Sequence, residues 1–246
     1  MQWLEWRAKS CPCTLSLTQG LPIGSAWRST YNQYIFSTPK AHSYQFLHKF
    51  LLLSQHHHPP ASHWVLKTPV HGYFFPELLK EFPDAHIVVT HRDPLNTLPS
   101  ISMLMSLLFS FFLRDAQSEA MNAYICKETF GVDMVEFMKR ILFPIEEARE
   151  REKEKGEKGR MFIDVEYADF LKDPMMTVKN IYQSVGLELS EEAEKKMLAY
   201  MEENKKERER DKERVTLTFS LGDFGIDKQY VMKEFAEYRK KRGYSQ

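Results

Sequence analysis

The sequence predicts an α/β fold in which a parallel β-sheet is flanked by helices. Within the strand Ala85–Thr90, Ile87–Val89 is a continuous run of β-branched residues, typical of a strand that is covered on both faces. A helical stretch, Phe75–Phe82, joins this strand to an earlier one at Trp64–Leu66, which makes a right-handed βαβ unit. Asp93-Pro94 then starts a helix, with aspartate as N-cap and proline as first helical residue.

The segments around this unit are predicted to be mostly helical. Tyr31–Leu53 indicates one or two helices, because its apolar residues recur at helical spacing. These residues are Tyr44, Phe46, Leu47, Phe50 and Leu51. The loop with His56-His57-His58 has no spaced partner ligand, which favours a surface loop over a metal site. Leu98–Leu113 is shorter than the roughly 20 residues of a membrane span, so it predicts a helix buried against the sheet.

The second half of the chain contains the same kinds of element. Glu146–Arg160 carries acidic and basic residues at helix spacing, which predicts a solvated helix tail on the surface. The run 161–167 predicts a third strand, and Asp173-Pro174 starts the helix after it. Ser190 is the predicted N-cap of the next helix. One last helix is predicted at 227–244.

Composition and charge narrow the classes of protein. A chain of 246 residues with 43% hydrophobic residues suits one large domain, predicted at 31–246 behind a poorly ordered lead-in at 1–30. A net charge of zero gives no basis for a nucleic-acid partner. The N-terminus has an early acidic residue and no apolar core of signal-peptide length, so we predict a cytoplasmic protein without a membrane span. Nothing in the sequence indicates the oligomeric state.

The cysteines predict neither disulfides nor a metal site. Cys11, Cys13 and Cys126 are too few and too irregularly placed for a disulfide framework. The first two lack the second pair of ligands that a zinc site needs. We therefore predict free thiols.

Polar and charged residues gather where the first two predicted strands end. Lys67-Thr68 and then His71 follow the first strand, Arg92 follows the second, and Ser100 comes eight residues later in the next helix. Parallel strands end at the same edge of the sheet, where α/β proteins bind ligands. A guanidinium fork, a hydroxyl and helix amides make a phosphate-binding combination. The alternative is a local ion pair between the arginine and the aspartate beside it.

Three stretches resemble a known family. WVLKTPVHGYFFPELLKEFPDAHIVVTHRDPLNTLPSISML, at 64–104, resembles the core of sulfotransferases that use 3′-phosphoadenosine 5′-phosphosulfate (PAPS). The similar branch has the patterns Leu-Lys-Ser/Thr-Pro-x-His and His-Arg-Asp-Pro with a downstream serine. DVEYADFLKDPMMTVKNIYQSVGLELS, at 164–190, and FSLGDFGIDKQYVMKEFAEYRKKRGY, at 219–244, are similar to later segments of that family. The resemblance covers roughly Tyr31 to Tyr244 and implies a P-loop nucleotide-kinase-like fold.

The resemblance implies roles for the residues at the strand ends. In the family, the arginine after the second strand and the serine eight residues on bind the 3′-phosphate of the nucleotide, which implies Arg92 and Ser100. The tyrosine that ends the third strand lines the adenine pocket, which implies Tyr167, with an aromatic that fills the sheet edge as the alternative. Lys67 corresponds to a lysine that steadies the transferring sulfonate, and Thr68 beside it is included among the cofactor-binding residues.

The resemblance also implies a reaction. Sulfonate is transferred from PAPS to a hydroxyl or amine of a small-molecule or glycan acceptor, and no metal is implied. His71 is the candidate base, since imidazole titrates near neutral pH. A structural hydrogen-bonding histidine is the alternative. In the cytosolic members the histidine directly follows the lysine and threonine, where this chain has Pro69, whereas the branch that it resembles has the histidine two residues further on.

One element of the family pattern is missing from the sequence. The family binds the 5′-phosphosulfate with a Pro-Lys/Arg-Ser-Gly-Thr-Thr type of turn after its first strand. No such string occurs here, and the nearest text, Gly20–Ser25, has isoleucine in place of the cation. We therefore expect an N-terminally truncated sulfotransferase fold with half of its cofactor site. The competing hypothesis is a non-catalytic remnant that acts as a nucleotide-binding or interaction module. A P-loop kinase is disfavoured, because no Gly-x-x-x-x-Gly-Lys-Ser/Thr occurs.

Overall fold

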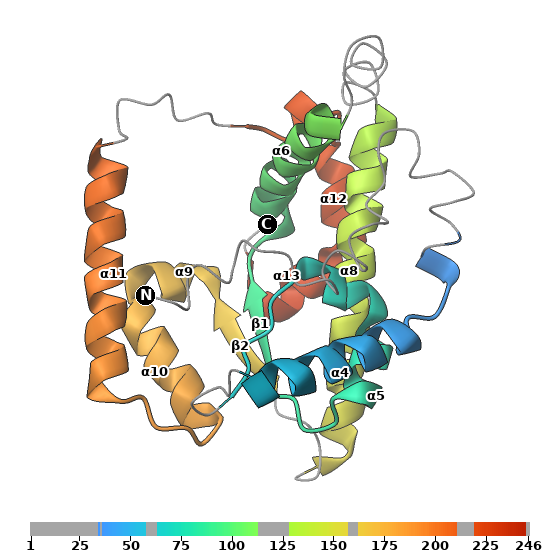
Figure 1. Cartoon of the computed structure of the whole chain (residues 1–246). Coiled ribbons are helices and arrows are strands. Elements are labelled where there is room, and N and C mark those ends of the chain that lie inside the picture. Colours follow the sequence, from blue (N-terminus) through green and yellow to red (C-terminus); the bar gives the residue numbers. More distant parts are fainter. Residues whose placement is uncertain are drawn as a thin grey trace.

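A computed structural model describes residues 34, 36–57, 63–112, 128–156, 162–210 and 219–244, and Figure 1 shows how their helices and strands are arranged. The lead-in predicted at 1–30 and the three cysteines lie outside these residues. The elements are α4 (Ala41–His57), η2 (Pro69–Phe74), α5 (Phe75–Glu81), β1 (Ile87–His91), α6 (Pro94–Phe112), α8 (Glu128–Glu154), β2 (Phe162–Glu166), α9 (Tyr167–Lys172), α10 (Pro174–Ser184), α11 (Glu191–Arg210), η5 (Gly222–Phe224), α12 (Lys228–Glu234) and α13 (Ala236–Arg242).

The centre of the fold is a parallel pair of strands, which confirms the predicted parallel sheet. β1 and β2 pair in a register that joins Ile87 to Phe162. Burial alternates along β1, since Val89 and His91 are buried whereas Val88 is 44% exposed. Successive side chains of a strand point to opposite faces. The described residues therefore cover one face of β1, and the prediction of a strand covered on both faces is wrong.

The strand predicted at Trp64–Leu66 is also wrong. The backbone of residues 63–68 has no regular secondary structure. A strand is stabilised by hydrogen bonds to a neighbouring strand, and among the described residues β1 and β2 pair only with each other. Val65 is 80% exposed and Leu66 is 41% exposed, so burial does not favour a strand at this position either.

Two apolar clusters hold the helices around the sheet. The first lies where α6, α8, η5, α12 and α13 meet, and its completely buried residues are Leu98, Phe130, Met134, Val135, Val231 and Phe235. The second lies between α4, η2 and α5, and its most buried residues include Tyr44, Leu47, Val70, Phe74 and Phe75. In Figure 1 the helices α6, α8, α12 and α13 lie on the β1 side of the sheet, and α9, α10 and α11 lie on the β2 side.

Three predicted helix starts are confirmed, at α6, α10 and α11. The side chains of Asp93, Asp173 and Ser190 each accept a hydrogen bond from a backbone amide of the following helix, at 3.0, 2.8 and 3.2 Å. Pro94 and Pro174 are the first residues of α6 and α10. These helices begin where local chemistry satisfies the unpaired amides of a helix N-terminus.

Two predictions about charged helices are corrected. The single C-terminal helix is divided into α12 and α13 at Phe235, where the backbone leaves helical geometry with φ of −110° and ψ of 17°. The stretch Glu146–Arg160 is not wholly solvated. Arg149 is buried, because its guanidinium turns toward β2 and forms an ion pair with Asp164 at 2.6 Å.

Gly72 allows η2 to pack closely on α8, and we expect Gly72→Ala to destabilise the fold. A Cβ atom at this position would lie 2.3 Å from the backbone oxygen of Ile141, so a helix must shift. We expect a loss of about 1–3 kcal/mol in the free energy of unfolding, measured by urea denaturation. Gly222→Ala is the control, since its nearest atom would lie 3.7 Å away, on Ser220. Equal stability of the two variants would contradict this account of the packing.

Candidate functional site

The structure brings Arg92 and Tyr167 together at the carboxyl edge of the sheet. Arg92 directly follows β1, and Tyr167 directly follows β2 as the first residue of α9, not as the last residue of the strand. Because His91 pairs with Glu166 in the parallel register, the residues that follow them emerge side by side. The guanidinium carbon of Arg92 lies 4.8 Å from the centre of the Tyr167 ring. Both side chains are exposed at this edge.

Asp93 pairs with Arg239 and not with Arg92, so the alternative of a local ion pair between Arg92 and Asp93 is wrong. Its carboxylate accepts a hydrogen bond from the Leu95 amide at 3.0 Å and two from the Arg239 guanidinium, both at 3.1 Å. Within the part of the chain that the structure describes, the exposed guanidinium of Arg92 has no carboxylate partner. One amide at the start of α6 is already used by Asp93, so that end of the helix offers fewer free donors to an anion than the sequence indicated.

Ser100 lies on α6, the helix that leaves this edge of the sheet. It is the seventh residue of α6 and its side chain is exposed. A helix rises about 1.5 Å per residue, so Ser100 stands about 9 Å along the axis from Pro94. Its hydroxyl is thus a donor on the same helix that begins beside Arg92.

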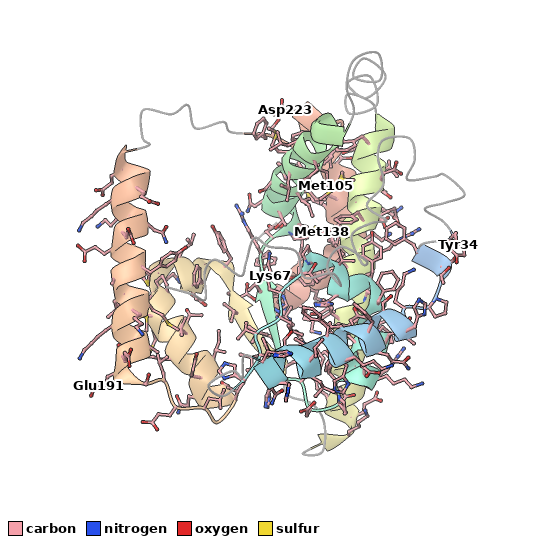
Figure 2. The ribbon with its side chains drawn as sticks, viewed as in Figure 1. Tyr34, Lys67, Met105, Met138, Glu191 and Asp223 are labelled. Atoms are coloured by element: carbon pink, nitrogen blue, oxygen red, sulfur yellow. The ribbon has the colours of Figure 1, made fainter. Side chains whose placement is uncertain are left out.

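Lys67 and Thr68 lie on the irregular segment before η2. Lys67 is exposed, and Figure 2 shows it where this segment crosses in front of β1 in that view. Its amine makes no ion pair with any described residue. The Thr68 hydroxyl oxygen accepts a hydrogen bond from the Val70 amide at 3.4 Å and caps η2. No acceptor for the hydrogen of that hydroxyl lies among the described residues, so the hydroxyl can donate to an anion.

His71 lies inside η2 and contacts the core. Its Nδ1 atom is 3.1 Å from the hydroxyl oxygen of Tyr44, a completely buried residue of α4. Burial lowers the pKa of His71 from its ordinary 6.5 to about 4. A group with this pKa is a weak base at neutral pH, and the catalytic role of His71 stays a prediction.

His71 and His91 predict a loss of stability on mild acidification. Burial lowers the pKa of His71 to about 4 and also lowers that of His91. Between pH 6.5 and 4 the unfolded chain therefore binds more protons than the folded chain, and the free energy of unfolding falls as the pH falls. For His71 the full effect is on the order of 3 kcal/mol. Urea denaturation at pH 7.5 and pH 5 measures it, and His71→Gln should reduce the difference. Equal stability at both pH values would contradict the assignment.

Sequence reasoning missed the buried polar network behind the strand ends. His91 follows the predicted strand Ala85–Thr90 directly in the sequence, but it is the last residue of β1 and is completely buried. Its Nδ1 atom lies 2.8 Å from the Tyr238 hydroxyl oxygen and its Nε2 atom 2.9 Å from Asp164. Asp164 also pairs with Arg242 at 3.0 Å. An aspartate inside the apolar strand 162–165 was the signal in the sequence for a buried partner. This network fastens α13 to the sheet, so we assign it a structural role.

The described residues contain no group of three or more His, Cys, Asp or Glu side chains with the arrangement of a metal site. Of the three consecutive histidines, the first two end α4 and His58 lies outside the described residues. Among the described helices, none is both long enough and apolar enough to cross a membrane.

Comparisons with known proteins agree with the fold. Residues 37–191, which include every predicted site residue, match the model of a family described as "Sulfotransferase family". Sulfotransferase STF9 from Mycobacterium avium is similar, with 25% identity and a TM-score of 0.69 over 86% of this chain and 50% of that one. Sulfotransferase STF1 from Mycobacterium tuberculosis H37Rv has 25% identity and a TM-score of 0.68 over 92% and 54%. The chain thus spans about half the length of these two proteins. A search among curated proteins found no match.

Proposed function

The chain belongs to the sulfotransferase family, and we propose that it binds PAPS and transfers the sulfonate group to a hydroxyl or amine of an acceptor. Small molecules and glycans are the acceptor classes that we propose. The site that carries this proposal lies at the carboxyl edge of β1 and β2, where α/β proteins of this kind bind their ligands.

The observation that carries the proposal is the exposure of the Arg92 guanidinium and its lack of a carboxylate partner among the described residues. Its guanidinium is exposed and stacked 4.8 Å from the centre of the Tyr167 ring, while the neighbouring Asp93 is bound to Arg239. This contact involves the ring face of Tyr167 and not the N–H groups, which stay available to a phosphate. This supports Arg92 as the ligand of the 3′-phosphate, with the Ser100 hydroxyl as a second donor.

The other predicted residues have side chains that suit the adenine, the sulfonate and the acceptor. We propose that Tyr167, already beside the arginine, lines the adenine pocket. Lys67 offers an exposed cation and Thr68 a free hydroxyl hydrogen, and we propose that these two contact the transferring sulfonate. His71 completes the set as an imidazole that contacts the acceptor group or the sulfonate.

In the proposed reaction the acceptor oxygen or nitrogen attacks sulfur in line with the bridging oxygen of PAPS. The new bond to sulfur forms as the bond from sulfur to the bridging oxygen breaks, and 3′-phosphoadenosine 5′-phosphate (PAP) leaves with that oxygen. The acceptor loses its proton to solvent or to a nearby base. Negative charge develops on the bridging oxygen, and a cation such as Lys67 stabilises it there.

The test is an assay of transfer with PAPS that carries radiolabelled sulfonate. The full chain is incubated with mixtures of alcohols, phenols, amines and glycans, and labelled products are separated from the nucleotide. We expect label in at least one acceptor class, and no label above background with Arg92→Ala. Label in no class, from a folded protein that binds PAP, would overturn the transferase proposal.

A second candidate is a nucleotide-binding module that does not transfer sulfonate. One sequence observation favours it: no string of the Pro-Lys/Arg-Ser-Gly-Thr-Thr type occurs in the 246 residues. Without that turn, the sulfonate loses the amides and the cation that the turn supplies, so charge in the transition state loses stabilisation. Single donors of this kind commonly contribute about 100-fold or more in rate. Binding of PAP without transfer of label is the result that this candidate predicts.

A further inference from the structure

Tyr44 and His71 form a part-buried contact that the proposed reaction does not use. Tyr44 lies on the first turn of α4, is completely buried and packs in the cluster formed by α4, η2 and α5. Its ring centre lies 5.8 Å from that of His71, and its hydroxyl oxygen is 3.1 Å from His71 Nδ1. The two residues lie on different elements and are 27 positions apart in the chain, so the contact depends on the tertiary fold.

The direction of this hydrogen bond follows from the burial of Tyr44. Burial raises the pKa of the Tyr44 hydroxyl, so the hydroxyl keeps its hydrogen at neutral pH. A buried O–H group needs an acceptor, and His71 Nδ1 is the partner that the described residues provide. The hydroxyl therefore donates and Nδ1 accepts. A neutral imidazole has one hydrogen on its two ring nitrogens, which places it on Nε2.

We infer that Tyr44 is a positioning residue that holds His71 as a neutral imidazole with its hydrogen on Nε2, so that His71 acts as a hydrogen-bond donor. The reverse tautomer would leave the buried Tyr44 hydrogen without an acceptor, which is unfavourable. The inference rests on the proposed function for the identity of the group that receives the bond. That group is the acceptor oxygen or a sulfonate oxygen of the donor.

A donor at this position has a different chemical use from a base. The Nε2–H group can orient an acceptor hydroxyl through its lone pair, or stabilise charge on a sulfonate oxygen. It cannot take the acceptor's proton at Nε2 until its own hydrogen has moved. Because the low pKa keeps the imidazole neutral, the donor state persists at physiological pH.

The first test reads the tautomer directly, without any assay of transfer. The full chain is labelled with nitrogen-15 in its histidines, and nitrogen shifts with long-range couplings to the ring hydrogens are recorded near pH 8. His71→Gln assigns the signals. We expect hydrogen on Nε2 of His71 in the unmodified chain, and a mixture of tautomers in Tyr44→Phe, which keeps the aromatic packing. Hydrogen on Nδ1 of His71 in the unmodified chain would overturn the inference.

His48 supplies an internal reference for this measurement. Its Nδ1 atom lies 2.8 Å from a carboxylate oxygen of Glu81. A carboxylate only accepts hydrogen bonds, so His48 must carry hydrogen on Nδ1. The two histidines should therefore show opposite patterns in the same spectrum.

The second test separates a donor from a base once transfer has been detected. His71→Gln keeps an N–H donor in a similar position, whereas His71→Ala removes it. A donor role predicts that His71→Gln retains kcat/KM within about 10-fold while His71→Ala loses about 100-fold or more. Equal losses in both variants would overturn the donor role. If the chain transfers no label, the proposed function fails, and the tautomer measurement still decides the state of His71.

Discussion

Replacing Arg92 by alanine is expected to weaken the binding of PAP by on the order of 100-fold. Charge-assisted hydrogen bonds contribute about 1.5–3 kcal/mol, and each 1.4 kcal/mol is a tenfold change in affinity. The guanidinium lies over the Tyr167 ring and has no competing carboxylate among the described residues, so its N–H groups are available to a phosphate. Calorimetric titration of both proteins with PAP measures the change.

Two controls make this result specific to the guanidinium fork. Arg92→Lys keeps the charge but not the fork, and we expect it to recover only part of the affinity. Arg151→Ala removes a different arginine, an exposed residue of α8 that pairs with Glu147 at 3.5 Å, and this variant should bind PAP like the unmodified chain. If Arg92→Ala binds PAP as tightly as Arg151→Ala does, Arg92 is not a ligand of the nucleotide.

Replacing Asp93 by alanine is expected to cause the largest loss of stability, about 3–5 kcal/mol in the free energy of unfolding. Arg239 is only 5% exposed, and its guanidinium donates two hydrogen bonds to Asp93 at 3.1 Å. Removing the carboxylate leaves a buried charge without this partner, and the loss of one member of a buried pair typically has this magnitude. The cap of α6 is lost as well. Urea denaturation followed by circular dichroism measures the effect.

Asp173 offers a matched control for this prediction. It also precedes a proline and also caps a helix, accepting a hydrogen bond from the Met176 amide at 2.8 Å, but it is exposed. Asp173→Ala should therefore cost only about 1 kcal/mol, the usual effect of losing a cap. If the two variants are equally stable, the contact between Asp93 and Arg239 contributes little and the role assigned to it is wrong.

Local chemistry explains which parts of the fold were predictable. The starts of α6 and α10 follow from Asp-Pro pairs, because capping and the fixed φ of proline act within one turn of helix. The meeting of Arg92 and Tyr167 follows from parallel pairing, which places the ends of both strands at one edge. These features need only neighbouring residues or one pairing rule.

The remaining features depend on contacts between distant parts of the chain. The strand predicted at Trp64–Leu66 does not form among the described residues, because a strand exists only with a partner. His91 is hydrogen-bonded to residues that lie 73 and 147 positions away. The contact of Tyr44 with His71 likewise joins separate elements. Such pairings leave no periodic pattern in the sequence. The contact of His71 with Tyr44 could therefore not be inferred from the position of His71 after a lysine and a threonine.

The most direct test of the central claim compares two nucleotides on the unmodified chain. PAP and adenosine 5′-phosphate differ only by the 3′-phosphate, the group that we assign to Arg92 and Ser100. Because charge-assisted hydrogen bonds to that phosphate contribute about 1.5–3 kcal/mol, calorimetry should find PAP bound at least about 10-fold more tightly. Equal affinity for the two nucleotides, or no binding of PAP by the folded chain, would contradict the assignment of this strand edge as the nucleotide site.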